Sequence, residues 1–140
     1  MNKEPLDPAK AERAVRAFAA VPFAKLLGME LGEIQSGVAS IHLTVRDELK
    51  QNQGVVHGGA IASLMDTAAA VALLTLIEVH ERVTTTDLTI HYLRPITTGR
   101  MSATARVVRR GQRVMVLNIE VTNEQGRTIA TAVTGYIKLQ

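Results

Sequence analysis

The feature that most limits the fold is a long apolar segment from Gly58 to Val79, which follows a polar loop. Most of its residues are Ala, Val, Leu, Ile or Met, and Asp66 and Thr67 interrupt it near the centre. A helix that is apolar nearly all round must be buried on most sides. In a chain of 140 residues its natural place is the concave face of a curved sheet. The polar interruption argues against a membrane span.

The segments on both sides of this helix show the alternation and turn residues of antiparallel strands. We expect strands at 29–34, 38–45, 83–93, 101–108, 114–121 and 128–139. Within 83–93, Leu88, Ile90 and Tyr92 alternate with more polar residues. The loop before the last strand carries Gly126 at a position that favours positive φ.

The N-terminal part predicts a helical arm. Residues 1–7 are polar and are expected to be loosely structured. Asp7 and Pro8 form a favourable helix start, so we expect a helix over 9–20 and a further turn over 23–27. The arm either caps the sheet or covers a pocket mouth or subunit contact. The whole order predicts an α+β fold, a single domain over 1–140 with an arm at 1–24.

Composition excludes several classes of function. The chain has no cysteine, which excludes disulfides and cysteine catalysis. This is compatible with a reducing compartment, and we expect a cytoplasmic location; no signal-peptide pattern opens the chain. The net charge of +3 suits an anionic ligand but is too small to indicate nucleic acid, and aromatic residues are only 3%. We expect neither a nucleic-acid nor a membrane partner.

Two features at the central segment indicate chemistry. Gly58 and Gly59 stand where the helix should begin, so ligand oxygens can approach the free backbone N–H groups there. Asp66 is a carboxylate in apolar surroundings, which is costly unless it is paired, hydrated or used. A structural Asp that caps a helix or pairs with an arginine is the alternative reading.

The pattern resembles the hotdog-fold acyl-CoA thioesterases, in particular the phenylacetate-pathway (PaaI-type) family. The likeness spans roughly residues 25–140, and its specific elements are Gly54, His57-Gly58-Gly59, Asp66 and the segment 87–95 that ends in Leu93-Arg94-Pro95. It implies a hotdog fold, in which an antiparallel sheet wraps around one long central helix. It also implies hydrolysis of an acyl-CoA to a free acid and coenzyme A, without a cofactor.

The resemblance also assigns roles to residues. It implies that Asp66 acts as general base or nucleophile, a choice that stays open, and that the Gly58 and Gly59 N–H groups polarise the thioester carbonyl. Gln51 stands where relatives carry Asn or Gln to orient substrate or water, and many PaaI-type members have Asn there. Thr85 matches a hydroxyl that assists the attacking water.

Further candidates surround these positions. His57 either contacts the substrate or holds the turn into the helix. Asn52 is adjacent to Gln51 and can be confused with it, and Thr84 precedes Thr85. Several arginines near strand ends suit the phosphates of coenzyme A, namely Arg94, Arg109, Arg110, Arg113 and Arg127. The other histidines show no zinc spacing, so we expect no metal.

Other functions fit less well. A serine hydrolase would need a Gly-x-Ser-x-Gly elbow, which the chain lacks. A hydratase or dehydratase on the same fold would need a paired histidine and acid. A non-catalytic acyl-CoA-binding or regulatory module would have no need for a buried carboxylate such as Asp66.

Helix geometry predicts a shared site. Gly58 and Asp66 are eight residues apart, which is roughly 12 Å along a helix axis. The Gly58 N–H and the Asp66 carboxylate of one chain therefore cannot act on the same thioester carbonyl, because reacting groups must lie within about 3–3.5 Å. We therefore expect a homodimer in which Asp66 of one chain faces Gly58 and Gln51 of its partner, in agreement with the family. The resemblance extends this to a homotetramer.

Overall fold

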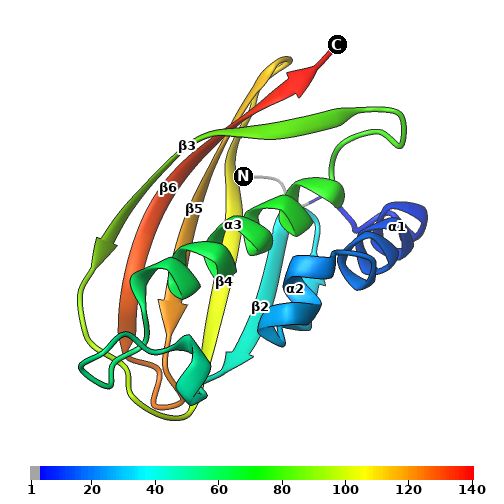
Figure 1. Cartoon of the computed structure of the whole chain (residues 1–140). Coiled ribbons are helices and arrows are strands. Elements are labelled where there is room, and N and C mark those ends of the chain that lie inside the picture. The colour runs from blue at the N-terminus through cyan, green and yellow to red at the C-terminus, as the bar shows by residue number, and fades with distance from the viewer. Residues whose placement is uncertain (1–3) are drawn as a thin grey trace.

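The computed structural model describes residues 4–140, and Figure 1 shows a curved sheet wrapped around one long helix. The helices are α1 (Pro8–Ala19), α2 (Pro22–Leu27) and α3 (Gly58–Leu74), with a short 3-10 turn, η1 (Asp47–Leu49). The strands are β1 (Glu30–Gln35), β2 (Val38–Thr44), β3 (Arg82–Tyr92), β4 (Arg100–Arg110), β5 (Val114–Thr122) and β6 (Thr128–Leu139). They form one antiparallel sheet in the order β1-β2-β4-β5-β6-β3. The predicted α+β architecture is confirmed.

The core lies between α3 and the concave face of the sheet (Figure 1). Leu64 and Met65 of α3 are fully buried, as are Ile41, Met115 and Leu117 on the strands. Alternate strand residues face this core; on β5, for example, every second residue is buried. The apolar composition of α3 is thus explained by burial in the sheet, as predicted.

α3 ends at Leu74, so the prediction that the helix reaches Val79 is wrong. The Thr75 hydroxyl donates to the Ala72 carbonyl (2.6 Å) and accepts from the Gly37 N–H (2.7 Å). Thr75 is thereby held by a strand turn far away in the sequence. The apolar residues that follow stay buried at Ile77, but as a turn rather than a helix.

Three cations donate hydrogen bonds to carbonyls of Leu74, the last residue of α3, and of the turn that follows it. We call Lys10, Arg13 and Arg110 the C-terminal clamp. Arg13 Nη2 donates to the carbonyls of Leu74 and Ile77, each at 2.7 Å. Lys10 Nζ and Arg110 Nη2 both donate to the Leu76 carbonyl at 2.8 Å. Cations at this end also complement the helix dipole.

The N-terminal arm begins as predicted. Asp7 caps α1 by accepting the Ala9 N–H at 2.9 Å, and α2 ends at Gly28, whose φ of 83° favours glycine. Residues 4–7 precede α1 without regular structure, and residues 1–3 of the predicted loose segment lie outside the described residues. α1 packs against the end of α3, where it supplies two members of the clamp.

A β-bulge changes the phase of β3. The pairing with β6 shifts between Thr85 and Asp87, which leaves Thr86 as the extra residue. Before the shift Thr85 is half-buried, whereas after it Leu88 and Ile90 take the inward positions. Bulges redirect side chains in this way and are common beside active sites. The bulge therefore turns Thr85 toward the helix.

Candidate functional site at the centre and start of helix α3

The carboxylate of Asp66 is held by two hydroxyl donors. Thr85 Oγ1 donates to Asp66 Oδ1 at 2.9 Å, and the Tyr136 hydroxyl lies 2.8 Å from the same oxygen and 3.0 Å from the Asp66 backbone carbonyl. Oδ2 has no hydrogen-bond partner within residues 4–140, and no lysine, arginine or histidine there forms an ion pair with Asp66. One carboxylate oxygen is therefore fixed and the other is free to react.

Tyr136 was not identified by sequence reasoning. It lies on β6 directly opposite Thr85 in the pairing with β3, and only 3% of it is exposed. Burial raises the pKa of its phenol well above the ordinary value, and the negative charge of Asp66 adds to this, while the hydrogen bond with Thr85 opposes it. Tyr136 thus remains a proton donor throughout the physiological range. The only signal in the sequence is a tyrosine within the predicted last strand, 128–139.

The start of α3 combines a capped and an uncapped N–H group. His57 is the N-cap, and its Nδ1 accepts the Gly59 N–H at 2.8 Å, which places the ring proton on Nε2. Within residues 4–140 the Gly58 N–H has no acceptor. The first turn of α3 contains no acidic residue. The free backbone donor of this turn is the Gly58 N–H, which lies at the positive end of the helix dipole.

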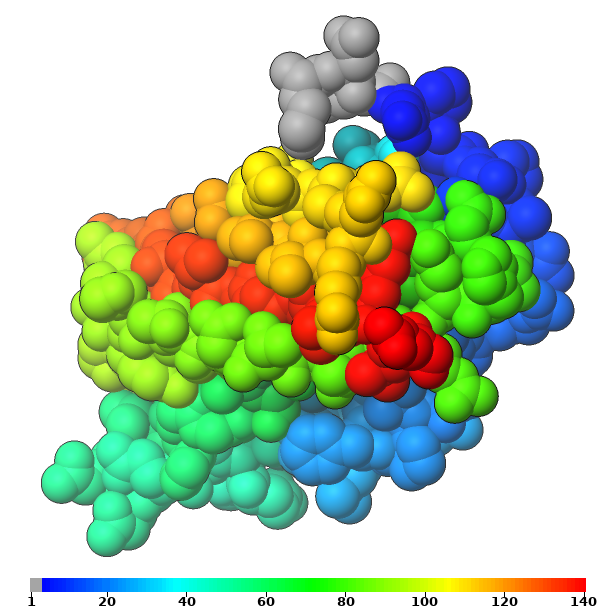
Figure 2. All heavy atoms as spheres, turned by 90° about the horizontal axis from the view of Figure 1, so that it is seen from above, coloured from blue at the N-terminus to red at the C-terminus, as the bar shows by residue number. Residues whose placement is uncertain are grey.

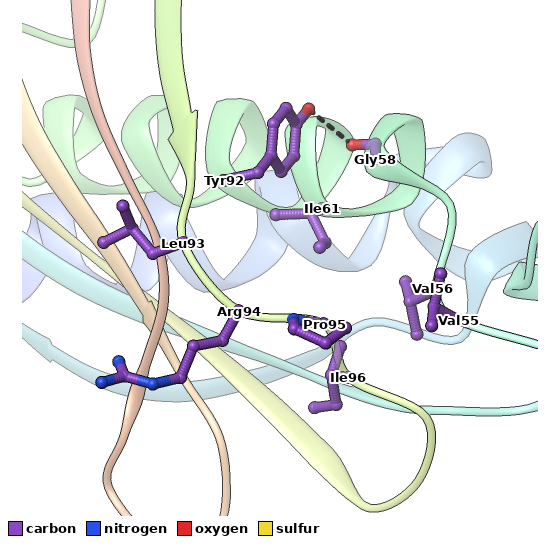
Figure 3. A pocket seen from close by; sticks show the side chains of 9 residues that line it. All are labelled: Val55, Val56, Gly58, Ile61, Tyr92, Leu93, Arg94, Pro95 and Ile96. Atoms are coloured by element: carbon purple, nitrogen blue, oxygen red, sulfur yellow. Dashed lines mark hydrogen bonds between the residues drawn. The ribbon is translucent and has the colours of Figure 1, made fainter.

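A pocket of about 290 Å³ opens beside this helix start (Figure 3). Its wall is mainly aliphatic, with Gly58 and Tyr92 on the helix side and the chain after β3 opposite. The lining residues are Val55, Val56, Gly58, Ile61, Tyr92, Leu93, Arg94, Pro95 and Ile96.

The loop before α3 uses the polar groups of Gln51 in its own turn. The Gln51 side-chain oxygen accepts the Gln53 N–H, and the Gln51 backbone bonds Val55. Asn52 is exposed in the same loop, and Thr84 is exposed on β3. Within one chain Gln51 is not brought to Asp66, so its role stays a prediction.

The predicted arginines fall into two groups at opposite ends of the sheet. Arg94 follows β3 at the Gly58 end, is exposed, and donates to the Thr128 carbonyl at 2.8 Å. Arg109, Arg110 and Arg113 lie at the other end, where Arg110 belongs to the C-terminal clamp. They do not form one cluster within a single chain.

The described residues show neither a metal-binding cluster nor a helix able to span a membrane. Residues 4–140 contain no group of three or more His, Asp and Glu side chains placed to hold a metal ion. That the protein needs no metal remains a prediction. Among the helices of this part of the chain, none is both long and apolar enough to cross a membrane.

Residues 53–130 match the thioesterase superfamily. The chain therefore belongs to this superfamily and is a thioester hydrolase, and the predicted hotdog fold is confirmed. It is 33% identical over 132 residues to the medium/long-chain acyl-CoA thioesterase YigI of Escherichia coli, covering 84% of this chain and 85% of the relative.

Solved structures agree with this assignment. The PaaI protein from the phenylacetic acid degradation operon of E. coli has a TM-score of 0.87 and 28% identity, covering 94% of this chain and 95% of that one. A thioesterase family protein from Silicibacter pomeroyi has a TM-score of 0.87 and 25% identity, covering 93% and 98%. The predicted likeness to PaaI-type proteins is confirmed.

Proposed function

We propose that the protein is an acyl-CoA thioesterase in which Asp66 is the reacting carboxylate. The observation that carries this proposal is the arrangement of Asp66 itself, whose Oδ1 is held by Thr85 and Tyr136 while Oδ2 stays free. The names of the relatives support acyl-CoA as the substrate class. A carboxylate that only stabilised the fold would be expected to use both oxygens or to pair with a cation.

The reaction breaks the thioester C–S bond and joins the acyl carbon to an oxygen from water. Asp66 either removes a proton from that water as general base or attacks the carbonyl itself to form an anhydride that water then opens. The coenzyme A sulfur leaves as a thiolate. Its proton comes from the water, either through Asp66 as general base or on later hydrolysis of the anhydride. The Gly58 N–H polarises the carbonyl, and Gly59 contributes through the His57 cap that fixes the turn.

The two halves of this site come from different chains of a dimer. Both Asp66 and Gly58 belong to α3, so in one chain they stay about 12 Å apart. β3 is an edge strand of 11 residues, and Figure 2 shows it as a continuous light-green band on the surface. Such an edge is a template for pairing with another strand. Antiparallel pairing of two β3 edges would bring the Asp66 region of each chain toward the helix start of its partner.

Asp66→Asn tests the reaction. This variant keeps an oxygen for Thr85 and Tyr136 but removes the carboxylate, so we expect kcat to fall by about 10²–10⁴. Thiol release is measured with short, medium, long and aromatic acyl-CoAs, and thermal unfolding checks the fold. An undiminished rate removes Asp66 from the mechanism.

The same panel separates the alternatives. Tight acyl-CoA binding without turnover by the wild type would favour a binding or regulatory module. Loss of enoyl-CoA absorbance without thiol release would favour a hydratase.

Complementation tests the shared site. Asp66→Ala chains are mixed with Gly58→Pro chains, each of which has lost most of its activity, under conditions that exchange subunits. A mixed dimer has one site with neither change, so activity should return to a measurable fraction of the wild-type rate. Confirmed exchange with no activity, or an active monomer, contradicts the shared site. Sedimentation of the wild type distinguishes the dimer from the tetramer.

A further inference from the structure

The peptide unit after Gly58 is held from both sides. The Tyr92 hydroxyl donates to the Gly58 carbonyl at 2.9 Å (Figure 3). The N–H of the same peptide unit, on Gly59, donates to His57 Nδ1. Tyr92 is 53% exposed, so burial of its ring in the core does not explain its position. Its hydroxyl instead connects the end of β3 with the first turn of α3.

The ring of Tyr92 also occupies the side-chain space of Gly58. A Cβ atom on Gly58 would lie 3.1 Å from Tyr92 Cζ and 3.2 Å from its hydroxyl oxygen, closer than ordinary packing. Glycine lets a substrate approach the helix start, but it also gives the backbone more freedom than any other residue. By contact and by its hydrogen bond, Tyr92 restricts the backbone of Gly58, as a side chain on that residue would otherwise do.

Tyr92 itself stands on a rigid support. Its backbone pairs with Ala130 of β6, and the next two N–H groups, on Leu93 and Arg94, both donate to the Ile129 carbonyl at 2.8 and 3.1 Å. The hydroxyl is therefore anchored through β6 to the centre of the sheet. A functional group is best held by such a rigid neighbour.

We propose that Tyr92 is a positioning residue for the oxyanion donor: it fixes Gly58 so that the free N–H points at the thioester oxygen. This inference rests on the proposed function. An oxyanion donor is effective only when it is oriented before the reaction, because reorientation during the reaction costs free energy. Loss of the Tyr92 hydroxyl should therefore lower kcat, and it should do so only while the Gly58 N–H is present.

The experiment is a double-mutant cycle between Tyr92→Phe and Gly58→Pro. Tyr92→Phe keeps the ring and removes the hydroxyl, and we expect kcat to fall about three- to tenfold while KM changes less than twofold. Gly58→Pro removes the N–H at a position where helices accept proline. In the Gly58→Pro background, Tyr92→Phe should have no further effect on kcat.

A purely structural role of Tyr92 predicts different results. It would lower the melting temperature of Tyr92→Phe, leave kcat per folded enzyme unchanged, and give additive effects in the cycle. Thr44→Val, which removes a hydroxyl from an exposed strand position on β2, away from the proposed β3 interface, is the matched control and should change neither parameter. An active wild type with unchanged kcat in Tyr92→Phe overturns the positioning role alone, whereas an inactive wild type overturns the proposed function.

Discussion

The two ends of α3 solve the same chemical problem in opposite ways. Every helix leaves backbone groups without intrahelical partners at both ends. At the C-terminal end, charged donors of the C-terminal clamp bind the carbonyl of the last helical residue, Leu74, and the carbonyls of Leu76 and Ile77 in the turn that follows. At the first turn the neutral His57 caps one N–H, while the Gly58 N–H has no acceptor in the described part of the chain.

Under the proposed mechanism, the last turn of α3 serves stability and the first turn serves chemistry. A carboxylate near the first turn would stabilise α3 by about 0.3–1 kcal/mol, yet the turn contains none. The helix keeps its positive end uncompensated and open to solvent. The closed end anchors the helix so that the open end can keep an unsatisfied donor.

The largest expected effect comes from removing the free N–H group at the first turn of α3. Gly58→Pro removes the free N–H, and we expect kcat to fall by about 10²–10³. Gly58→Ala is the control, since it adds the same Cβ against Tyr92 but keeps the donor. Steady-state kinetics of both variants isolate the N–H. Equal losses in the two variants would mean that crowding, not the donor, matters.

Removal of the clamp bonds at the C-terminal end of α3 should lower stability without changing kcat. Arg13→Met removes both bonds to the Leu74 and Ile77 carbonyls, and we expect a loss of about 2–3 kcal/mol in the free energy of unfolding. Arg16→Met, on the same helix but 72% exposed, should change it by less than about 0.5 kcal/mol. Denaturant titration measures both. A fall in kcat per folded Arg13→Met enzyme would contradict the division of roles.

Removal of the Tyr136 hydroxyl tests the centre of the helix. Tyr136→Phe leaves Asp66 Oδ1 with Thr85 alone, so the carboxylate is less firmly oriented. We expect kcat to fall about tenfold, with KM nearly unchanged. Thiol-release kinetics provide the measurement, with Thr85→Val as the matched variant. An unchanged kcat would reduce Tyr136 to a packing residue.

The smallest effect concerns alkaline stability. Burial raises the pKa of Tyr136 in the folded protein above the value of about 10 in the unfolded chain. Its contribution is therefore complete below about pH 10 and is lost as pH rises toward the folded pKa. The melting temperature should fall as pH rises above about 10, less steeply in Tyr136→Phe. Identical slopes would show that other groups cause the loss.

The sequence predicts the sheet well because its strands alternate and its turns carry glycine. The end of α3 is different, since Leu76 and Ile77 have helical composition. What stops the helix is Gly37 and the clamp, which come from distant parts of the chain and have no local signal.

The glycines and Asp66 of the candidate site stand out in the sequence, whereas the residues that hold them in place do not. Alternation extended back from Leu88 and Ile90 would direct Thr86 inward, whereas the bulge directs Thr85 inward. The bulge is accommodated by Gly135 on the facing strand, because a Cβ there would lie 2.5 Å from Asp87 Oδ1. Strand pairing fixes such details, so the position of Thr85 came from resemblance and Tyr136 was missed.

The scarcity of aromatic residues gives each half of the site its own optical reporter. The chain has two tyrosines and no tryptophan, so its near-ultraviolet emission comes from Tyr92 and Tyr136 alone. One stands at the open helix start and the other beside the Asp66 carboxylate. A Tyr→Phe change at either position leaves a chain with a single emitter. Stopped-flow fluorescence of the two chains can then time the arrival of a ligand at each half without an added dye.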